Sequence, residues 1–326
     1  MREPQHLNDG CLKGRRLLVT GGAGFIGSHV VERALALGAK VRVLDDFSTG
    51  SERNLRPFLD RIEVVEADVA ELAACQTAMR GVDSVVHFAA IVAVEYSLQA
   101  PARTLAVNVT GTANILQAAH EAGAERVVYA SSSSVYGDAP APHREGHEGT
   151  PGSPYALSKL MAEHLAAQFY RCYGLSALGL RFFNVYGPRQ SADSYYAAVV
   201  SRFLHAASRR EPLTIHGTGN QSRDFVYVHD VAAATLVALT SAQTTTGVFN
   251  VGTGKPTTIR ELASSIQALL PGLHQLRSEA ARENDILLSL ADMKRFEQSF
   301  GWRPETPLAE GLKATAEPYL TPRASE

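Results

Sequence analysis

The sequence has few cysteines, no long apolar run and no concentration of charge of either sign. Its three cysteines, Cys11, Cys75 and Cys172, lie far apart without metal-ligand spacing, so we expect reduced thiols and no metal site. No segment approaches the roughly 18 uninterrupted apolar residues that indicate a membrane-spanning helix. The first residues, MREPQHLNDGCLKG, lack the apolar core of a secretion signal. We therefore expect a cytoplasmic protein.

Charged residues are nearly balanced, with a formal net charge of −2. Nucleic acids and acidic membranes usually bind concentrated positive surfaces, so we expect neither of them as a partner. An anionic ligand must then be held by a few local arginines. At 326 residues and 45% hydrophobic composition, the chain is long enough for one large or two modest domains with a substantial core.

Short apolar, β-branched runs alternate with helix-length amphipathic stretches through the first half of the chain. The runs are RRLLVT (15–20), KVRVLD (40–45), IEVVEAD (62–68), DSVVHFAA (83–90) and ERVVYASS (125–132). Continuous apolar strands are typical of a parallel sheet that helices cover on both faces. Helices are predicted over 28–37 and 102–122, each followed by a glycine at a C-cap position. The fold class is therefore α/β, with a Rossmann-type doubly wound parallel sheet.

A glycine-rich turn lies directly between the first predicted strand and helix, in LLVTGGAGFIGSHV. Gly22, Gly24 and Gly27 have the spacing of the dinucleotide-binding fingerprint, in which glycines allow a tight turn and a close approach of the backbone to a pyrophosphate. Asp45 ends the second strand, where a carboxylate binds the adenosine ribose hydroxyls and repels a 2′-phosphate. The pattern predicts NAD rather than NADP, although a purely structural turn is the alternative.

Tyr155 and Lys159 are four residues apart and share one face of a predicted helix. Next to a nicotinamide, a lysine beneath a tyrosine lowers the pKa of the phenol and makes it a general base. The run of four serines from Ser131 to Ser134 ends the fifth strand. A hydroxyl at that place can hydrogen-bond a substrate oxygen as its proton leaves. Outside this context, the tyrosine and lysine spacing arises by chance as readily as by function.

The pattern loosens after SALGLRFFNVYG (176–187), where Pro- and Gly-punctuated segments begin. Beyond it we predict helices over 196–209 and 258–270 and a strand-like segment over 247–254. We predict an NAD-binding Rossmann domain over 14–187 whose sheet is completed by 224–254. A smaller C-terminal substrate-binding α/β domain is predicted over 188–223 and 255–320.

From about residue 15 to 315 the sequence resembles the extended short-chain dehydrogenase/reductase family, specifically its NAD-dependent nucleotide-sugar epimerase/dehydratase branch. The motifs that carry the resemblance are TGGAGFIGSH, DDFSTG, ADV, HFAA, NVTGT, SSSSVYG, YALSK, RFFNVYGPRQ and RDFVYVHD. The resemblance implies catalytic roles for Ser132, Tyr155 and Lys159.

The resemblance also implies which residues bind the cofactor and the substrate. The implied NAD-binding residues are Gly21, Gly24, Phe25, Ile26, Gly27, Asp45, Asp46, Phe47, Ser48, Gly50, Asp68, Val69, Phe88, Ala89, Ala90, Asn108, Ser131, Tyr155, Lys159 and Phe182. The implied substrate-binding residues are Val92, Ser132, Ser133, Ser134, Asn184, Tyr196, Ala198, Val199, Arg223, Arg282, Asp285 and Ser289. Without the resemblance, Arg223 and Arg282 are equally interpreted as surface salt-bridge partners.

All members of this branch oxidise the sugar first, usually at C4. Relatives that are 4,6-dehydratases follow the catalytic Ser/Thr with an Asp-Glu pair, and UDP-glucuronate decarboxylases carry a glutamate just before VYG, whereas this chain has Ser133 and Ser134. Neither serine is a competent base at neutral pH. We therefore expect a UDP-hexose 4-epimerase, in which the keto sugar rotates and the same hydride returns to its other face.

Three alternatives stay open at this point. A UDP-glucuronate 4-epimerase shares the serine motif, but this chain lacks an arginine shortly after YGPRQ to bind a carboxylate. Another nucleotide-sugar dehydratase is the second. A non-catalytic NAD-binding sensor is the third, although such proteins usually lose the tyrosine or the lysine. Departures from the commoner family pattern at Val92, Glu95 and Tyr96 put the identity of the sugar in doubt.

Two further expectations concern the sugar and the assembly. By resemblance, Ser289 falls where a bulky tyrosine closes the pocket beside the C2 substituent in glucose-only relatives, so N-acetylated sugars are expected to fit. A serine that merely ends a strand or caps a helix is the alternative. Relatives dimerise through the helix after HFAA and the Tyr155 helix, and the apolar content of 104–119 is compatible with a homodimer.

Overall fold

The computed structural model describes residue 7 and residues 10–191, 198–242, 246–270, 275–281 and 286–320. Seven parallel strands form one large sheet in the order β10-β6-β5-β4-β1-β2-β3. These strands are β1 (Arg16–Thr20), β2 (Lys40–Asp45), β3 (Ile62–Glu66), β4 (Ser84–His87), β5 (Arg126–Ser132), β6 (Ser176–Phe182) and β10 (Gly247–Val251). The predicted Rossmann-type doubly wound sheet is confirmed.

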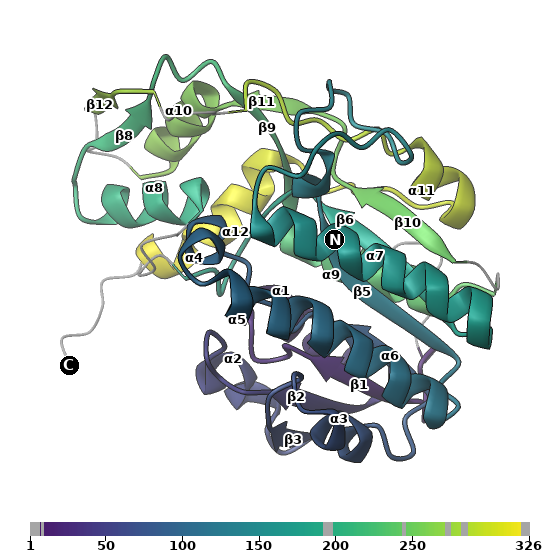
Figure 1. Cartoon of the computed structure of the whole chain (residues 1–326). Coiled ribbons are helices and arrows are strands. Elements are labelled where there is room, and N and C mark those ends of the chain that lie inside the picture. The colour runs from purple at the N-terminus through teal and green to yellow at the C-terminus, as the bar shows by residue number, and fades with distance from the viewer. Residues whose placement is uncertain are drawn as a thin grey trace.

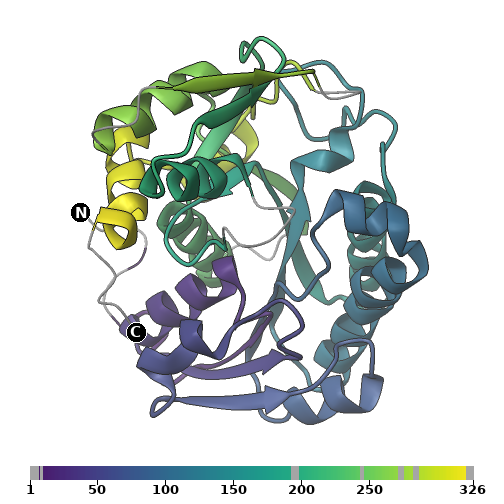
Figure 2. The same cartoon turned by 90° about the vertical axis from the view of Figure 1, so that its left-hand side faces the viewer.

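Helices cover both faces of the large sheet, as Figures 1 and 2 show. On one face lie α1 (Phe25–Ala36) and α9 (Val228–Thr240), which contact each other. The opposite face is covered by α3 (Leu72–Ala78), α6 (Gly111–Glu121) and α7 (Pro154–Tyr173). Because both faces are covered, the central strands are mainly apolar and buried, which is why they could be recognised as continuous runs. The edge strand β3 differs, since Glu63, Val64 and Glu66 are exposed.

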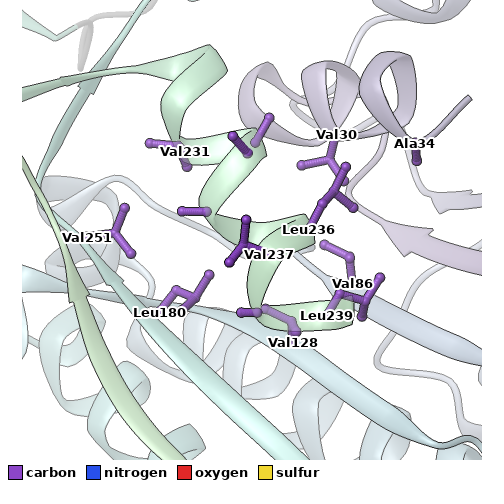
Figure 3. Close-up of a cluster of buried hydrophobic side chains, with 14 of the residues drawn as sticks. Val30, Ala34, Val86, Val128, Leu180, Val231, Leu236, Val237, Leu239 and Val251 are labelled. Carbon is purple, nitrogen blue, oxygen red and sulfur yellow. The ribbon is translucent and has the colours of Figure 1, made fainter. Parts of the chain in front are cut away.

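The core on the α1 and α9 side is a layer of aliphatic side chains (Figure 3). Val86, Val128 and Leu180 project from three neighbouring strands toward Leu236 and Val237 of α9, and all five are almost completely buried. Burying a side chain of this size contributes about 1.5–3 kcal/mol. α9 therefore fixes β5, whose carboxyl end carries the predicted catalytic Ser132.

A second, smaller layer follows the large sheet in the chain. Its three-stranded sheet joins β7 (Asn184–Tyr186), β9 (Ser222–Tyr227) and β11 (Pro256–Thr258), and its two-stranded sheet joins β8 (Leu213–His216) and β12 (Leu276–Glu279). α8 (Val199–Ser208), α10 (Ile259–Leu269) and α12 (Leu308–Leu320) pack on these strands around a separate apolar cluster. In Figure 1 this layer lies at the upper left, next to the carboxyl ends of the large sheet.

One short helix that follows the strands of the smaller layer in the chain packs back on the large sheet. α11 (Lys294–Phe300) packs on β10, with Phe296 and Phe300 against Phe249. The sequence analysis predicts that residues 224–254 complete the large sheet. Within this range β10 extends the large sheet, whereas β9 belongs to the small three-stranded sheet. The division into an NAD-binding and a substrate-binding domain stays a prediction.

Local sequence signals explain where the key helices begin and end. In α7, Ser153 accepts a hydrogen bond from the Ala156 N–H, Pro154 occupies the first turn and Gly174 ends the helix at φ +71°. α10 begins with a capping box between Thr258 and Glu261. Among the described residues, no helix is both long and apolar enough to cross a membrane.

Two predicted helices differ from the observed ones. The helix expected over 28–37 already begins at Phe25, because the last glycine of the fingerprint lies inside its first turn. The helix expected over 102–122 is divided into α5 (Pro101–Leu105), a π-helical turn η2 (Ala106–Thr110) and α6. The sequence pattern missed the π turn, which places the side chain of Asn108 in the interior.

Candidate functional site

The predicted site residues gather along one edge of the large sheet. The strand order reverses between β1 and β4, so the chain leaves β1 and β4 in opposite directions and opens a crevice at their carboxyl ends. The glycine turn follows β1, Asp45 ends β2, Phe88 to Ala90 follow β4, Ser131 and Ser132 end β5, and Phe182 ends β6. Parallel strands bring these separate sequence positions to the same edge.

The glycine turn between β1 and α1 is too crowded for side chains. Gly21 has φ +68°, and a Cβ there would lie 2.6 Å from the Ala89 backbone nitrogen. A Cβ on Gly27 would lie 2.1 Å from the Gly21 carbonyl oxygen. Gly24 is the N-cap of α1, and Phe25 and Ile26 begin a helix with no acidic residue in its first turn. The turn and the free helix N-terminus fit a pyrophosphate group.

Asp45 is buried at the end of β2 and binds two loops at once. Its Oδ2 accepts a hydrogen bond from the Ala23 N–H at 2.8 Å, and its Oδ1 accepts one from the Phe47 N–H at 2.9 Å. Burial raises the pKa of this carboxyl, and the two hydrogen bonds oppose that rise. Each oxygen keeps a further lone pair for a ribose hydroxyl, as the sequence predicts.

The loops after β2 and β3 are joined by a cation that the sequence analysis missed. Arg103 of α5 donates a hydrogen bond to Asp68 at 2.7 Å and lies 3.9 Å from Asp46. Burial raises the pKa of Asp68, but hydrogen bonds from the Ala70 N–H and from Arg103 outweigh it and lower this pKa overall. Asp46 also accepts hydrogen bonds from Ser48, which shapes the loop toward Gly50.

The middle of the crevice is apolar and is supported from behind by an amide. The Phe88 and Phe182 rings meet edge to face with centroids 5.5 Å apart. Ala89 and Ala90 follow Phe88 in the chain, and Val69, after β3, is buried. Asn108 exchanges hydrogen bonds with both backbone groups of Ile91 and donates to Ser158 Oγ at 2.9 Å. It thus ties the segment after β4 to α7, and its implied role in binding NAD stays a prediction.

The three predicted catalytic residues come together where α7 crosses the end of β5. The Tyr155 phenol is hydrogen-bonded to Ser132, and Ser132 Oγ also accepts a hydrogen bond from the Ser134 N–H at 3.1 Å. Lys159 is almost fully buried, donates to the Ala130 carbonyl oxygen at 2.9 Å and lies 5.9 Å from the centroid of the Tyr155 ring. The arrangement can move a proton between the Tyr155 oxygen and a substrate hydroxyl bound next to Ser132.

The phenol pKa differs from the sequence expectation. Burial raises the pKa of Tyr155, and the hydrogen bond with Ser132 lowers it only in part. Burial also lowers the pKa of Lys159 to about 8, while the Glu163 carboxylate raises it. Protein burial therefore opposes the depressed phenol pKa that the Tyr155 and Lys159 spacing predicts, because desolvation penalises the charged form of both groups.

A cavity of about 400 Å³ lies between the crevice and the smaller layer. Five of the predicted substrate-binding residues line it: Val92, Asn184, Ala198, Val199 and Arg223. Its lining comes from two parts of the fold. Val92 just precedes α4 (Val94–Gln99) and Glu95 lies within it, and Ser97 Oγ of this helix accepts a hydrogen bond from the Tyr155 N–H. Thr214 and His216 of β8 line the cavity from the smaller layer.

Other predicted substrate residues lie elsewhere. Ser133 and Ser134 are in the 3-10 turn η3 (Ser133–Tyr136), just after Ser132. Ser289 is buried, donates its N–H to the Ser222 carbonyl oxygen and is not among the described residues that line the cavity. Ser289 caps no helix, since the next helix starts only at Lys294. Tyr196, Arg282 and Asp285 lie outside the described residues.

Sequence reasoning missed several polar residues of the cavity, among them Arg202, His216 and Gln221. They come from α8, β8 and the segment before β9, where no local motif distinguishes a lining residue from a surface one. Glu95 also lines the cavity, and it could be noticed in the sequence because it departs from the family pattern. Within the described ranges, no group of three or more His, Cys, Asp or Glu residues is arranged to hold a metal ion.

The geometry agrees with what comparison with known proteins finds. Residues 17–252 match the NAD dependent epimerase/dehydratase family. The chain belongs to this family. It is 38% identical over 308 residues to UDP-glucose 4-epimerase of Mycolicibacterium smegmatis, covering 93% of this chain and 97% of the relative.

Two solved structures extend the likeness to three dimensions. The UDP-N-acetylglucosamine 4-epimerase from Methanobrevibacter ruminantium, in complex with UDP-N-acetylmuramic acid, has a TM-score of 0.89 at 35% identity and covers 94% of this chain and 98% of its own. A UDP-glucuronic acid 4-epimerase from Bacillus cereus, with a fluorinated UDP-glucuronic acid and NAD, has a TM-score of 0.86 at 27% identity, with 93% and 98% covered.

The protein is thus an NAD-dependent enzyme of the nucleotide-sugar epimerase/dehydratase type, and the predicted family and cofactor are confirmed. The residues present fit NAD, because the crowded glycine turn leaves room only for backbone and the buried carboxylate of Asp45 borders it. The assignment of single residues to the cofactor or the substrate stays a prediction.

Proposed function

We propose that this enzyme interconverts the C4 epimers of UDP-hexoses, both UDP-glucose with UDP-galactose and UDP-N-acetylglucosamine with UDP-N-acetylgalactosamine. The observation that carries the proposal is the meeting of Ser132, Tyr155 and Lys159 at the end of β5, with two serines rather than carboxylates next in the chain. Elimination of water from the keto sugar needs a further acid and base, and a serine hydroxyl supplies neither at neutral pH.

The roles of the residues follow from their positions. Tyr155 takes the proton of the sugar 4-hydroxyl, and Ser132 hydrogen-bonds the oxygen that loses it. Lys159 holds a positive charge near the phenol and is itself oriented by the Ala130 carbonyl. NAD, when bound, accepts and returns the C4 hydride, and its positive ring adds to the charge that stabilises the phenolate. After rotation of the keto sugar, Tyr155 returns its proton to the same oxygen.

The cavity can hold the UDP part beside its two arginines. Arg202 and Arg223 line it together with Asn184, which gives the local positive charge that a diphosphate requires in a chain of net charge −2. Thr214, His216 and Gln221 supply polar groups next to them for a base or ribose. The sugar then lies beside Val92 and Glu95, since α4, which carries Glu95, is hydrogen-bonded to the Tyr155 N–H.

A turnover assay of the NAD-bound enzyme against single nucleotide sugars tests this function. We expect each UDP-hexose to convert into its C4 epimer without net change of mass or redox state, with and without the N-acetyl group. By the resemblance, Ser289 leaves space for that group, so Ser289→Tyr should lower kcat/KM selectively for the N-acetylated pair. A product lighter by one water would contradict epimerisation and would make Glu95 a candidate base.

Glu95 favours a neutral sugar over a uronate. Glu95 lines the cavity from α4, beside the expected sugar, and its carboxylate would repel the C6 carboxylate of UDP-glucuronate. We expect Glu95→Gln to raise kcat/KM for UDP-glucuronate relative to UDP-glucose by about three- to tenfold, which corresponds to about 0.7–1.4 kcal/mol of repulsion between two like charges that water partly screens.

The control for this prediction is Glu121→Gln, which removes an exposed carboxylate on α6 that accepts hydrogen bonds from Gln76 and Gln117. It should leave the ratio unchanged. Raising the salt concentration should reduce the preference of the wild type for UDP-glucose over UDP-glucuronate, since salt screens partly exposed charges. Equal kcat/KM ratios in wild type and Glu95→Gln would remove the charge argument for a neutral sugar.

We also propose that the enzyme is a homodimer whose second copy covers α4 and α7. Leu98, Leu157 and Met161 are 61%, 45% and 39% exposed on these two adjacent helices. Exposed apolar groups of this density mark interaction surfaces. A Leu157→Glu/Met161→Glu variant should sediment as a monomer at concentrations where the wild type is a dimer. Leu59→Glu, also at an exposed leucine (40%), should remain dimeric; a monomeric wild type would contradict the proposal.

A further inference from the structure

Three successive turns of α7 contact three successive residues at the end of β5. Tyr155 is hydrogen-bonded to Ser132, Lys159 donates to the Ala130 carbonyl oxygen at 2.9 Å, and Glu163 Oε1 accepts from Ser131 Oγ at 2.5 Å. Residues four apart lie on one face of a helix, so these contacts form a ladder along α7. The contact between Glu163 and Ser131 is the one that the proposed chemistry does not use.

Glu163 is itself held by a buried guanidinium. Arg181 of β6, which is 1% exposed, donates to Glu163 Oε1 at 2.8 Å and to Oε2 at 2.7 Å. Its third nitrogen donates to Glu148, and its guanidinium lies 4.8 Å from the Tyr136 ring centroid. A bidentate pair has a defined geometry, since two parallel hydrogen bonds fix both groups. Separating the buried partners would also leave an uncompensated charge on each. Glu163 therefore cannot readily move away from Ser131.

We propose that Glu163 is a positioning residue for the epimerisation chemistry, which holds the Ser131–Ser132 end of β5 in register with α7 and keeps the Lys159 ammonium charged. Only one of its two tests, the pH–rate profile of epimerisation, rests on the proposed function. The first part follows from the hydrogen bond to Ser131, the neighbour of Ser132. The second part follows from placing one carboxylate a helical turn beyond Lys159 in a buried environment.

The charges around Lys159 determine the direction of the effect. Lys159 faces Tyr155 and Glu163 on its own helix, the Ala130 carbonyl on β5 and His87 on β4. Burial lowers the pKa of His87 to about 3, so this ring is neutral and adds no charge near pH 7. Burial lowers the pKa of Lys159 to about 8, and Glu163 opposes that lowering. Without the Glu163 charge, Lys159 loses its proton at a lower pH.

The test compares Glu163→Gln with Glu148→Gln in the full-length, NAD-bound enzyme. Both variants remove a carboxylate from the Arg181 guanidinium, but only Glu163 also bonds Ser131. With ¹³C-labelled lysine, NMR titration follows the Lys159 ammonium directly. We expect its midpoint to fall by about one pH unit in Glu163→Gln, the size expected for loss of a nearby opposite charge, and to stay within a few tenths in Glu148→Gln.

The pH–rate profile of UDP-hexose epimerisation gives the second readout. In Glu163→Gln the alkaline limb should move to lower pH with the Lys159 titration, and kcat should fall about tenfold with little change in KM. Glu163→Asp keeps the charge but is too short to reach both Ser131 and Arg181. It should restore most of the alkaline limb while kcat stays low, and it also serves if Glu163→Gln fails to fold.

Three results would overturn the inference. The Lys159 midpoint is unchanged in Glu163→Gln, or it shifts equally in Glu148→Gln, or Glu163→Asp retains wild-type kcat. Either of the first two results would refute the effect of Glu163 on the Lys159 charge, and the third would refute its positioning of the Ser131–Ser132 end of β5. Because the NMR titration needs no substrate, it decides the electrostatic part even if the wild type converts no UDP-hexose, a result that would refute the proposed function alone.

Discussion

Tyr155→Phe is expected to lower epimerisation turnover by about 10²- to 10⁴-fold while NAD stays bound. The substitution removes only the oxygen that is hydrogen-bonded to Ser132 and leaves the ring over the Lys159 ammonium. The proton of the sugar 4-hydroxyl then has no acceptor, because the neighbouring serine hydroxyls are far too weak as bases at neutral pH. Single-turnover and steady-state rates on UDP-glucose, together with NAD binding, measure the effect.

The matched control is Tyr173→Phe, which removes a phenol oxygen from the exposed end of the same helix. It should have wild-type turnover, since Tyr173 is 55% exposed and contacts only the His120 and Phe169 rings among its described aromatic neighbours. Tyr155→Phe with turnover within a few-fold of wild type would show that another group is the base. Loss of NAD in that variant would instead indicate a structural role.

Gly27→Ala is expected to weaken NAD binding about 10- to 100-fold and to lower the thermal stability of the protein. The added Cβ would lie 2.1 Å from the Gly21 carbonyl oxygen, and this neighbour is backbone that cannot rotate away. α1 must then shift from the glycine turn, at a cost of about 1–3 kcal/mol, where each 1.4 kcal/mol corresponds to tenfold in affinity. Titration calorimetry with NAD and thermal unfolding measure both effects.

Gly152→Ala is the control, because its Cβ would meet no atom within 4 Å and its backbone does not require positive φ. We expect it to bind NAD normally and to be as stable as the wild type or slightly more so, since alanine restricts the unfolded chain. Normal NAD affinity in Gly27→Ala would mean that the turn tolerates displacement of α1 and that the close packing is not needed for binding.

Much of the nucleotide-binding half could be predicted from the sequence, because its signals are local. The central strands of the large sheet are buried on both faces and appear as apolar runs, and the turn after β1 needs glycines wherever the chain folds this way. The spacing of Tyr155 and Lys159 follows from the helical period alone. The order of the strands and the helix-breaking π turn at 106–110 have no comparable local signal.

The substrate side depended on long-range contacts instead. The cavity is lined from the segment after β4, from β7, from α8 and from β8 and β9, so no single stretch of sequence identifies Arg202, His216 or Gln221 as its members. Ser289 could be placed by resemblance, yet its burial beneath Ser222 becomes evident only when its segment lies beside β9. The local sequence therefore does not indicate how far a side chain lies from the cavity.

The sequence by itself determined the alternation of strands and helices, the NAD-binding turn and the residue types available for proton transfer. The tertiary structure alone decided which groups face those residues and therefore how they titrate. Lys159 and Glu163 are adjacent on one helix face, but the burial that lowers the pKa of Lys159 and the Arg181 that holds Glu163 come from β5 and β6. Desolvation and ion pairing depend on distances across the fold, whereas propensity and periodicity depend only on neighbours in the chain.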